Sequence, residues 1–447
     1  MITRDLARIC AEAEVASFPD EVRSLTQHCL LDWIGVAVSG ASDPLVEMVA
    51  TEVLEQGGSP QATLLGRGAQ VSTQQAALVN GTASHALDYD DVHPILVGHP
   101  TVVIVPALLA LAEHRGASGR EFIEAFVAGY ETIARIGALV NPGHYERGFH
   151  ATATVGSFGS AAACARLMGL DDAQTAHALG IAGTQAAGLK SMFGTMCKPL
   201  HAGKASQNGL LAASLAARGF ESRTDVLECA QGFAATQSEN FNVEAAIADP
   251  PGGYHLRANL FKYHAACYLT HAAIECALRI RETLLQKVDA LDKIVITVHP
   301  GCDSVCNIPT PTTGLEAKFS LRMTVAYALA GIDTAAIASY TDESCTDPTL
   351  VALRDRARVE FDPALDRMQT RLSVALTDGT LLEEFHDSGI AMADLDAQGA
   401  RLSAKFHALV DPIFGNQAAA KIEAAVSNLE SIDNIADLVA PLAGPRH

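Results

Sequence analysis

Between residue 2 and about residue 270, apolar residues recur mostly three and four positions apart, with Ala and Gly unusually frequent. This spacing predicts helices with one apolar face, and small side chains let such helices pack closely. Leu25–Val38 is typical, because acidic residues and a proline precede it and Gly40 follows it. Ser157–Met168 and Gly209–Arg218 are further Ala-rich segments. This half of the chain is therefore predicted to be nearly all helical.

The pattern changes near residue 290, where a continuous run of β-branched residues, Ile294–Val298, is ended by Pro300 and Gly301. Such a run predicts a strand, and the later Thr377-Asp-Gly-Thr380 is a strong hairpin turn signal. The predicted strands are Lys293–His299, Arg358–Phe361, Leu372–Leu376 and Leu381–Phe385, with helices over Ala317–Leu329 and Pro348–Arg356.

The chain is long enough for two domains, since its 447 residues exceed the roughly 250 to 300 at which one core stops growing. The helical pattern returns after about residue 401. We therefore expect a mostly α protein with a smaller α+β domain. In this arrangement residues 1–269 together with 401–447 form a large all-helical domain, and residues 270–400 form an inserted α+β domain.

The formal charge of -20 argues against binding to nucleic acid, which relies on clustered Lys and Arg. An anionic small-molecule substrate would have to be met by a few cations gathered in a pocket against this overall field. A Lys or Arg near a candidate site is therefore a stronger candidate for binding such a substrate.

The ten cysteines lie mostly in Ala-rich apolar stretches and form no CxxC motif, so no metal or iron–sulfur role is expected. The N-terminus lacks the apolar core of a signal peptide. The longest apolar stretch, Thr101–Ala112, has about 12 residues, short of the roughly 20 that span a bilayer. We expect a cytoplasmic protein without a membrane segment.

Three Asp and three His fall within a short segment that follows Asn80: His85, Asp88, Asp90, Asp91, His93 and His99. Clustered carboxylates and imidazoles suit general acid–base catalysis, because repulsion and burial move their pKa values toward neutrality. A metal site is the competing chemical interpretation. Capping of helices and loops is the structural alternative for any single residue.

Three further segments carry reactive side chains. After His144, Tyr145 or His150 could move a proton, while Arg147 offers a planar fork to a carboxylate. Between Cys197 and Ser206, the cations are Lys198, His201 and Lys204. A helix predicted to begin near Lys204 would direct its N-terminus at a bound anion. In the last segment, Lys262 is embedded among aromatic and small apolar residues.

Common cofactor and hydrolase motifs are missing from the sequence. It contains no GxGxxG after a strand, no P-loop and no GxSxG elbow. The usual sequence motifs of nucleotide-dependent enzymes and of serine hydrolases are therefore missing. A lysine Schiff base with pyridoxal phosphate stays formally open.

Together and in this order, the segments resemble the MmgE/PrpD family. The matching motifs are Leu31-Asp-Trp-Ile-Gly35, Ala62-Thr-Leu-Leu-Gly66, Asn80-Gly81 through Asp91, His99-Pro100, Gly148-Phe149-His150, Lys198-Pro199-Leu200-His201-Ala-Gly203, Lys262 with Cys267, and Glu316-Ala-Lys-Phe319-Ser320. The resemblance covers nearly the whole chain. It implies a large helical domain with a smaller α+β domain, a homodimer, and chemistry next to carboxylates of small polyacids with neither metal nor organic cofactor. Carried over by position, the site comprises Asp88, His99, His150, Lys198 and Lys262.

One position departs from the family pattern. Dehydratase and decarboxylase members carry an active-site tyrosine after Phe-Ser, where this chain has Met323, and a methionine cannot exchange a useful proton. A simple repacking change is the alternative explanation. In length and motif detail the resemblance is greatest to members that epimerise iminodisuccinate, which implies proton abstraction and return at the carbon α to a carboxylate. Tyr145 and Lys198 would carry the protons.

The remaining site residues receive supporting roles under this hypothesis. Asp88, His99 and His150 would tune or replace the two proton carriers. Carboxylates of the substrate would be held by Lys262, Arg147, His201, Lys204 and Arg322. The alternatives are a lyase like 2-methylcitrate dehydratase or cis-aconitate decarboxylase, and, more remotely, a non-catalytic polycarboxylate-binding protein.

Overall fold

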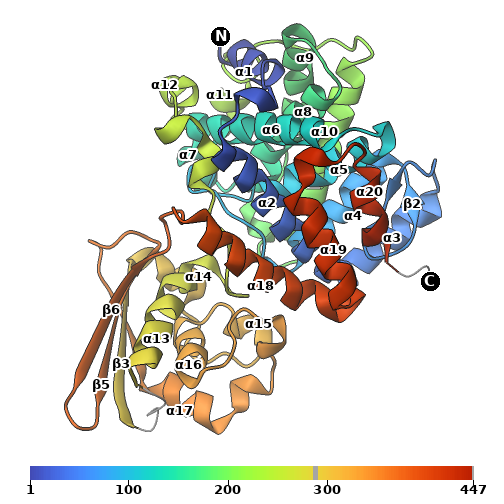
Figure 1. Ribbon diagram of the computed structural model, residues 1–447. Coiled ribbons are helices and arrows are strands. Elements are labelled where there is room, and N and C mark those ends of the chain that lie inside the picture. Colours follow the sequence, from blue (N-terminus) through green and yellow to red (C-terminus); the bar gives the residue numbers. More distant parts are fainter. Residues whose placement is uncertain (285–289, 445–447) are drawn as a thin grey trace. The chain divides into compact units, whose positions relative to one another are not determined.

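The computed structural model describes residues 1–284 and 290–444, and the chain divides into two compact units (Figure 1). Unit 1 comprises Met1–Phe261 and Met392–His447, and unit 2 comprises Lys262–Ala391. The domain boundaries expected at residues 270 and 400 stay a prediction.

Unit 1 is built from helices, as the spacing of its apolar residues predicts. Its longer helices are α1 (Ile2–Ala11), α2 (Asp20–Gly40), α3 (Pro44–Gln56), α4 (Thr73–Ala86), α5 (Thr101–Arg115), α6 (Gly119–Val140), α8 (Ala151–Leu167), α9 (Asp172–Gly183), α10 (Cys197–Ala216), α18 (Leu395–Phe414) and α19 (Asn416–Ser427). The shorter elements are α7 (Gly143–Glu146), α11 (Phe233–Gln237), α12 (Val243–Ile247), α20 (Ala436–Val439), and the antiparallel pair β1 (Ala62–Thr63) and β2 (Gln70–Val71).

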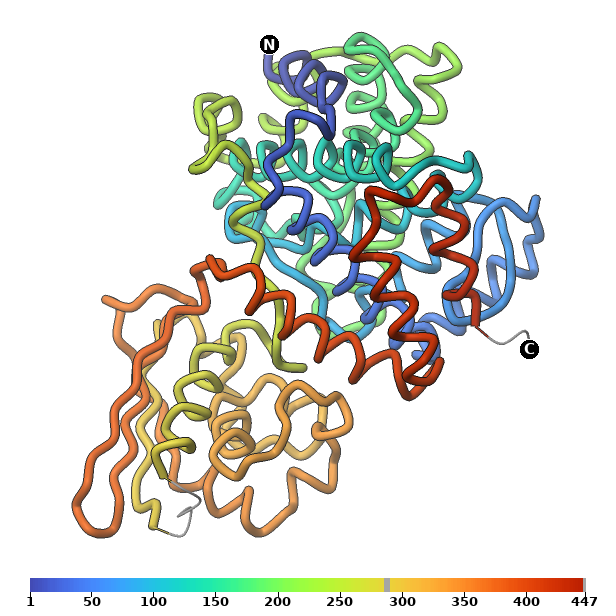
Figure 2. Tube along the Cα trace, viewed as in Figure 1, coloured from blue at the N-terminus to red at the C-terminus, as the bar shows by residue number. Residues whose placement is uncertain are grey.

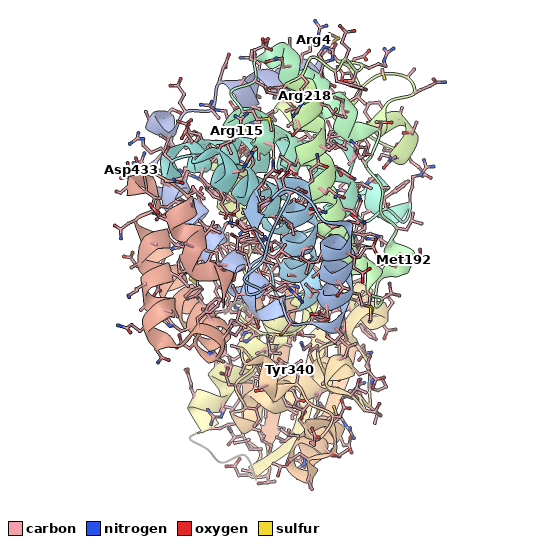
Figure 3. The ribbon with its side chains drawn as sticks, turned by 90° about the vertical axis from the view of Figure 1, so that its right-hand side faces the viewer. Arg4, Arg115, Met192, Arg218, Tyr340 and Asp433 are labelled. Carbon is pink, nitrogen blue, oxygen red and sulfur yellow. The ribbon has the colours of Figure 1, made fainter. Side chains whose placement is uncertain are left out.

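Helix α8 is the central helix of unit 1. It is buried continuously from Ala151 to Ala165 and packs against α6, α9 and α10. Helix α18, from the last part of the chain, lies along α2 from its first part, as the red and blue segments in Figure 2 show. Charged side chains such as Arg4, Arg115 and Arg218 lie on the outside of this unit (Figure 3).

The longest apolar stretch of the sequence is a core helix. All residues from Thr101 to Ala112 of α5 are buried. Among the described residues no single helix is long and apolar enough to cross a membrane; α2 and α3 reach that length and composition only together, and they meet at a bend of 85°.

Unit 2 combines a four-stranded sheet with helices. Its elements are α13 (His271–Leu284), β3 (Leu291–Val298), α14 (Asp303–Cys306), α15 (Gly314–Ala317), α16 (Leu321–Ala330), α17 (Pro348–Arg356), β4 (Ala357–Phe361), β5 (Gln369–Leu376) and β6 (Leu381–Asp387). The strand order is β4-β3-β5-β6, with β4 parallel to β3 and the other pairs antiparallel. Helix α13 packs on β5 and β6. The predicted fold class, a mostly α protein with a smaller α+β part, is confirmed.

One helix expected in unit 2 is wrong in its extent. The helix predicted over Ala317–Leu329 begins only at Leu321, as α16; Ala317 is the last residue of the preceding helix α15, and residues 318–320 separate the two. Ser320 has an extended backbone, and its hydroxyl accepts a hydrogen bond from the Met323 amide at 3.2 Å. A serine that caps a new helix in this way cannot continue the preceding one.

Helices α4 and α10 cross in unit 1 at two glycines. A Cβ atom on Gly81 would lie 2.8 Å from the Gly203 Cα, and one on Gly203 would lie 2.2 Å from the Leu78 carbonyl oxygen. Backbone therefore touches backbone at this crossing, and no larger residue fits without moving a helix.

We expect Gly203→Ala to lower the free energy of unfolding by about 1 to 3 kcal/mol, because the added methyl forces α4 and α10 apart. Gly35→Ala in α2 is the matched control, since its Cβ would meet the Leu409 side chain at an ordinary 3.4 Å. There the gain in helix propensity should leave stability equal or up to about 1 kcal/mol higher. Urea unfolding followed by circular dichroism measures both, and equal stability of the two variants would contradict the crossing.

Candidate active site

The segment that joins α4 to α5 carries the first group of predicted site residues. His85 lies in the last turn of α4, Asp88 and Asp90 follow it, and His99 lies two residues before α5 begins at Thr101. Asp91 anchors the end of the segment, because its carboxylate accepts the Thr101 hydroxyl at 2.5 Å and the Thr101 amide at 3.3 Å. Both ends of this segment are thereby fixed to helices.

Two histidines share the carboxylate of Asp90. His85 Nδ1 lies 2.9 and 3.0 Å from the two Asp90 oxygens, and His99 Nδ1 lies 2.8 Å from Oδ2. Burial is the main cause that lowers the pKa of His85 to about 4. Burial alone would raise the pKa of Asp90, but the two imidazoles together hold it well below its usual range. A neutral His85 thus donates to a charged, buried Asp90.

Asp88 connects this buried pair to a lysine. Its Oδ1 lies 2.7 Å from Lys198 Nζ and 3.8 Å from His99 Nε2. The side chains of Asp88, His99 and Lys198 are 32%, 11% and 17% exposed, whereas His85 and Asp90 are almost fully buried. The network therefore runs from a buried inner end to an outer end that solvent and small molecules can reach.

Lys198 comes from a helix that begins earlier than the sequence predicts. The helix expected to begin near Lys204 is α10, which begins at Cys197, so that expectation is wrong. Pro199 lies in the first turn of α10, where a proline is tolerated because its missing N–H has no partner in the helix there. Lys198 and His201 consequently lie in the first turns of α10.

The early start of α10 places Lys204 apart from Lys198. Lys204 donates to Gln207 Oε1 at 2.6 Å, and both line a pocket between α3, α4 and α10 together with Met48 and Glu52. Partial burial lowers the pKa of Lys204. Its predicted role in holding substrate stays a prediction.

A second pair of histidines adjoins the network. His150 Nδ1 and His201 Nδ1 are 3.0 Å apart, so one of them donates to the other. The rings of His150 and His85 are stacked with centroids 6.2 Å apart, and Phe193 packs edge-on against His150 at 4.9 Å. Burial first, and then the charge of Lys198, holds the pKa of His150 well below its usual range. His150 is therefore a neutral base next to a cation.

Tyr145 contacts a lysine that the sequence patterns did not single out. Lys190 Nζ lies 3.6 Å from the centroid of the Tyr145 ring and donates to the Tyr145 carbonyl at 3.0 Å. Arg147, two residues later, is exposed. Lys190 and Phe193 both lie in the segment around Met192 that precedes α10 (Figure 3), where no motif marks them. They are recognised as candidate site residues only from their contacts in the structure, Lys190 with Tyr145 and Phe193 with His150.

The other predicted site residues belong to unit 2. Lys262, the first residue of that unit, is 2% exposed. Arg322 donates its Nε to the Ala357 carbonyl and its Nη1 to Asn307 Oδ1 at 2.8 Å, so two of its donors serve the structure of unit 2. Met323 is fully buried in α16. The functional roles expected of Lys262 and Arg322 stay predictions.

The network also contains ligand types that a metal ion could use. One donor atom each from His85, Asp88, Asp90 and His99 lies within 4.8 Å of the others. However, Lys198 already places a positive charge 2.7 Å from Asp88, which opposes a cation beside that carboxylate. The arrangement suits proton transfer better than metal binding.

Two family models match this chain, and together they cover most of its length. Residues 4–246 match the MmgE/PrpD N-terminal domain, and residues 264–431 match the MmgE/PrpD C-terminal domain. A cis-aconitate decarboxylase of Homo sapiens is 26% identical over 462 residues, which cover 99% of this chain and 95% of the relative. That of Mus musculus is 26% identical over 466 residues, covering 99% and 94%. That of Aspergillus terreus is 25% identical over 475 residues, covering 99% and 96%.

The low pKa of His85 makes the stability of the fold depend on pH. In the unfolded chain a histidine takes up a proton near pH 6.5, whereas folded His85 does so only near pH 4. The unfolded state therefore binds more protons between these values, and stability is lost as pH falls through this window. For His85 alone the loss between pH 7 and pH 4.5 is about 2 to 3 kcal/mol.

We expect His85→Gln to reduce this acid-induced loss by that amount, while His114→Gln, which changes an exposed residue of α5, leaves it unchanged. Urea unfolding at pH 7 and pH 4.5 measures the difference. The same loss in wild type and His85→Gln would show that folded His85 titrates normally.

Proposed function

This chain belongs to the MmgE/PrpD family, and on that premise we propose that it is a cofactor-independent lyase acting on a small polycarboxylate, at a carbon next to a carboxylate. The observation that carries the proposal is the position of Asp88 between Lys198 at 2.7 Å and His99 at 3.8 Å, at the accessible end of a buried network. The names of the relatives, which are decarboxylases, favour a lyase.

The charges of this site suit a polyanionic substrate. The chain as a whole carries -20, so a polyanion is attracted only where cations are gathered. Lys198 supplies a charged donor, and His201 beside it supplies a further hydrogen-bond donor. A substrate carboxylate that contacts Lys198 would compete with Asp88 for the same ammonium group.

The proposed chemistry needs one proton donor and a means to stabilise a carbanion. In a decarboxylation, the bond to the leaving carboxylate breaks, carbon dioxide departs, and the electron pair stays on the carbon. That pair is spread into a neighbouring carboxylate whose charge Lys198 can balance. A proton then reaches the carbon from Lys198 or His99, which Asp88 and Asp90 hold in place. In a dehydration the sequence differs: a neutral base of the same site removes the proton next to the carboxylate, and the electron pair forms the new double bond. The hydroxyl of the adjacent carbon takes a proton from Lys198 or His99 and leaves as water.

Epimerisation of iminodisuccinate stays a second candidate. Met323 favours it, because it replaces the tyrosine that the resemblance implies for lyase members, although the relatives named above give it no support. It would use the same groups to remove a proton and return it to the opposite face. A non-catalytic binding protein is the outcome if a polyacid binds but none of its bonds changes.

The homodimer implied by the family resemblance and the cytoplasmic location expected from the sequence also remain proposals. Light scattering after size-exclusion chromatography tests the first, and cell fractionation the second.

The proposed activity is tested by proton NMR of the chelator-treated protein in D2O, incubated separately with cis-aconitate, 2-methylcitrate and iminodisuccinate. A lyase converts one of the first two into a product with new alkene signals. An epimerase instead exchanges the α-proton of iminodisuccinate for deuterium, with inversion.

We expect Lys198→Ala to lower the rate by about 100-fold or more, because the proton donor at Asp88 is removed. Lys421→Ala, which truncates an exposed lysine of α19, is the matched control and should keep the wild-type rate. An unchanged rate in Lys198→Ala would exclude this lysine from the chemistry. Failure of the wild-type protein to convert any of the three compounds would count against the proposed function itself.

A further inference from the structure

A buried ion pair lies behind the segment that carries the site carboxylates. Lys405 of α18 places its Nζ 2.6 Å from Asp32 Oδ1 of α2, and the two side chains are only 3% and 2% exposed. Removing both charges from water is costly, and apolar residues of similar size often replace such pairs without loss of stability. Stability alone is therefore a weak reason for this pair.

The same ammonium group also contacts the site segment. Lys405 Nζ donates to the Tyr89 carbonyl at 2.7 Å and lies 3.9 Å from the centroid of the Tyr89 ring, which is fully buried. Tyr89 stands between Asp88 and Asp90 in the chain. A single cation thus holds the peptide that links the two carboxylates of the network.

The geometry of this segment requires such a restraint. Asp88 has a φ of 49°, in the left-handed region that non-glycine residues rarely adopt. The carboxylates of the next acidic residues, Asp90 and Asp91, are buried, and so is that of Asp32, whose charge acts on Asp91. Burial first, opposed by the Thr101 hydrogen bonds and reinforced by the charges of Asp32 and Asp90, raises the pKa of Asp91 to about 7. Without a cation these groups repel one another and favour a different backbone path.

We infer that Lys405 is a positioning residue for the proposed site. Its ammonium group, oriented by Asp32, fixes the Tyr89 carbonyl on the side of α18. Asp88 is thereby directed toward Lys198, and Asp90 toward the two imidazoles. Lys405 acts through the backbone of Tyr89, whose carbonyl accepts a hydrogen bond from its ammonium group. The inference rests on the proposed function only for its kinetic readout.

The test uses the full chain and a variant without buried charge, Asp32→Asn with Lys405→Met, since either substitution alone would leave one buried charge uncompensated. The matched control is Glu124→Gln with Arg166→Met, which removes a partly buried ion pair of 2.7 Å between α6 and α8 in the same unit. Circular dichroism and thermal unfolding establish that each variant is folded.

Two readouts then separate positioning from a merely structural role. On the substrate that wild type converts, kcat of the Asp32/Lys405 variant should fall by about tenfold or more with KM unchanged, because misplaced catalytic groups slow the chemical step. In protein labelled with 13C-histidine, the ring Cε1–H peaks of His85 and His99, assigned from His→Gln variants, should shift. The control variant should change neither.

Unchanged kcat and unshifted histidine peaks in a folded Asp32/Lys405 variant would overturn the inference. If that variant does not fold, Lys405→Arg takes its place. It keeps the charge beside Asp32, but its planar guanidinium cannot reproduce the contacts of one ammonium group with Asp32 and the Tyr89 carbonyl. For this variant, kcat and the histidine ring peaks then test the inference in the same way. If wild type converts no polycarboxylate, the proposed function fails, and the histidine peaks alone test the role of Lys405.

Discussion

Helices α4 and α10 cross at Gly81 and Gly203 so closely that no Cβ atom fits between them. This contact sets the distance between the end of α4, which carries His85, and the start of α10, which carries Lys198. A crossing wider by one side chain would separate an ammonium group and a carboxylate that now lie 2.7 Å apart. The small residues of the core therefore serve the site as well as the packing.

The site has a gradient of burial along one line of polar groups. At its inner end, Asp90 is charged because the two imidazoles stabilise its carboxylate, and His85 is neutral because burial disfavours its protonated form. At its outer end, Asp88 and Lys198 remain partly exposed. Rigid inner groups can thus orient outer groups that exchange protons with a bound molecule.

Several elements could be predicted from local pattern. Leu25–Val38 and Pro348–Arg356 are helical in the structure, and the Asp378-Gly379 turn does join β5 to β6. These features depend on propensity, capping and turn chemistry over a few residues. The prediction failed where one residue could serve two purposes. Pro199 can end a loop or begin a helix, and Ser320 can extend a helix or cap the next one.

By itself the sequence determined the family, the helical character of the larger part and the segments that hold the reactive groups, because each depends on residues that are near one another in the chain. Only the tertiary structure decided the partners: Lys198 with Asp88, Lys204 with Gln207, and Lys405 with Asp32, a pair 373 residues apart. The physical reason is that ion pairing and pKa values depend on distance in space and on burial. Neither is encoded in the local spacing of residue types.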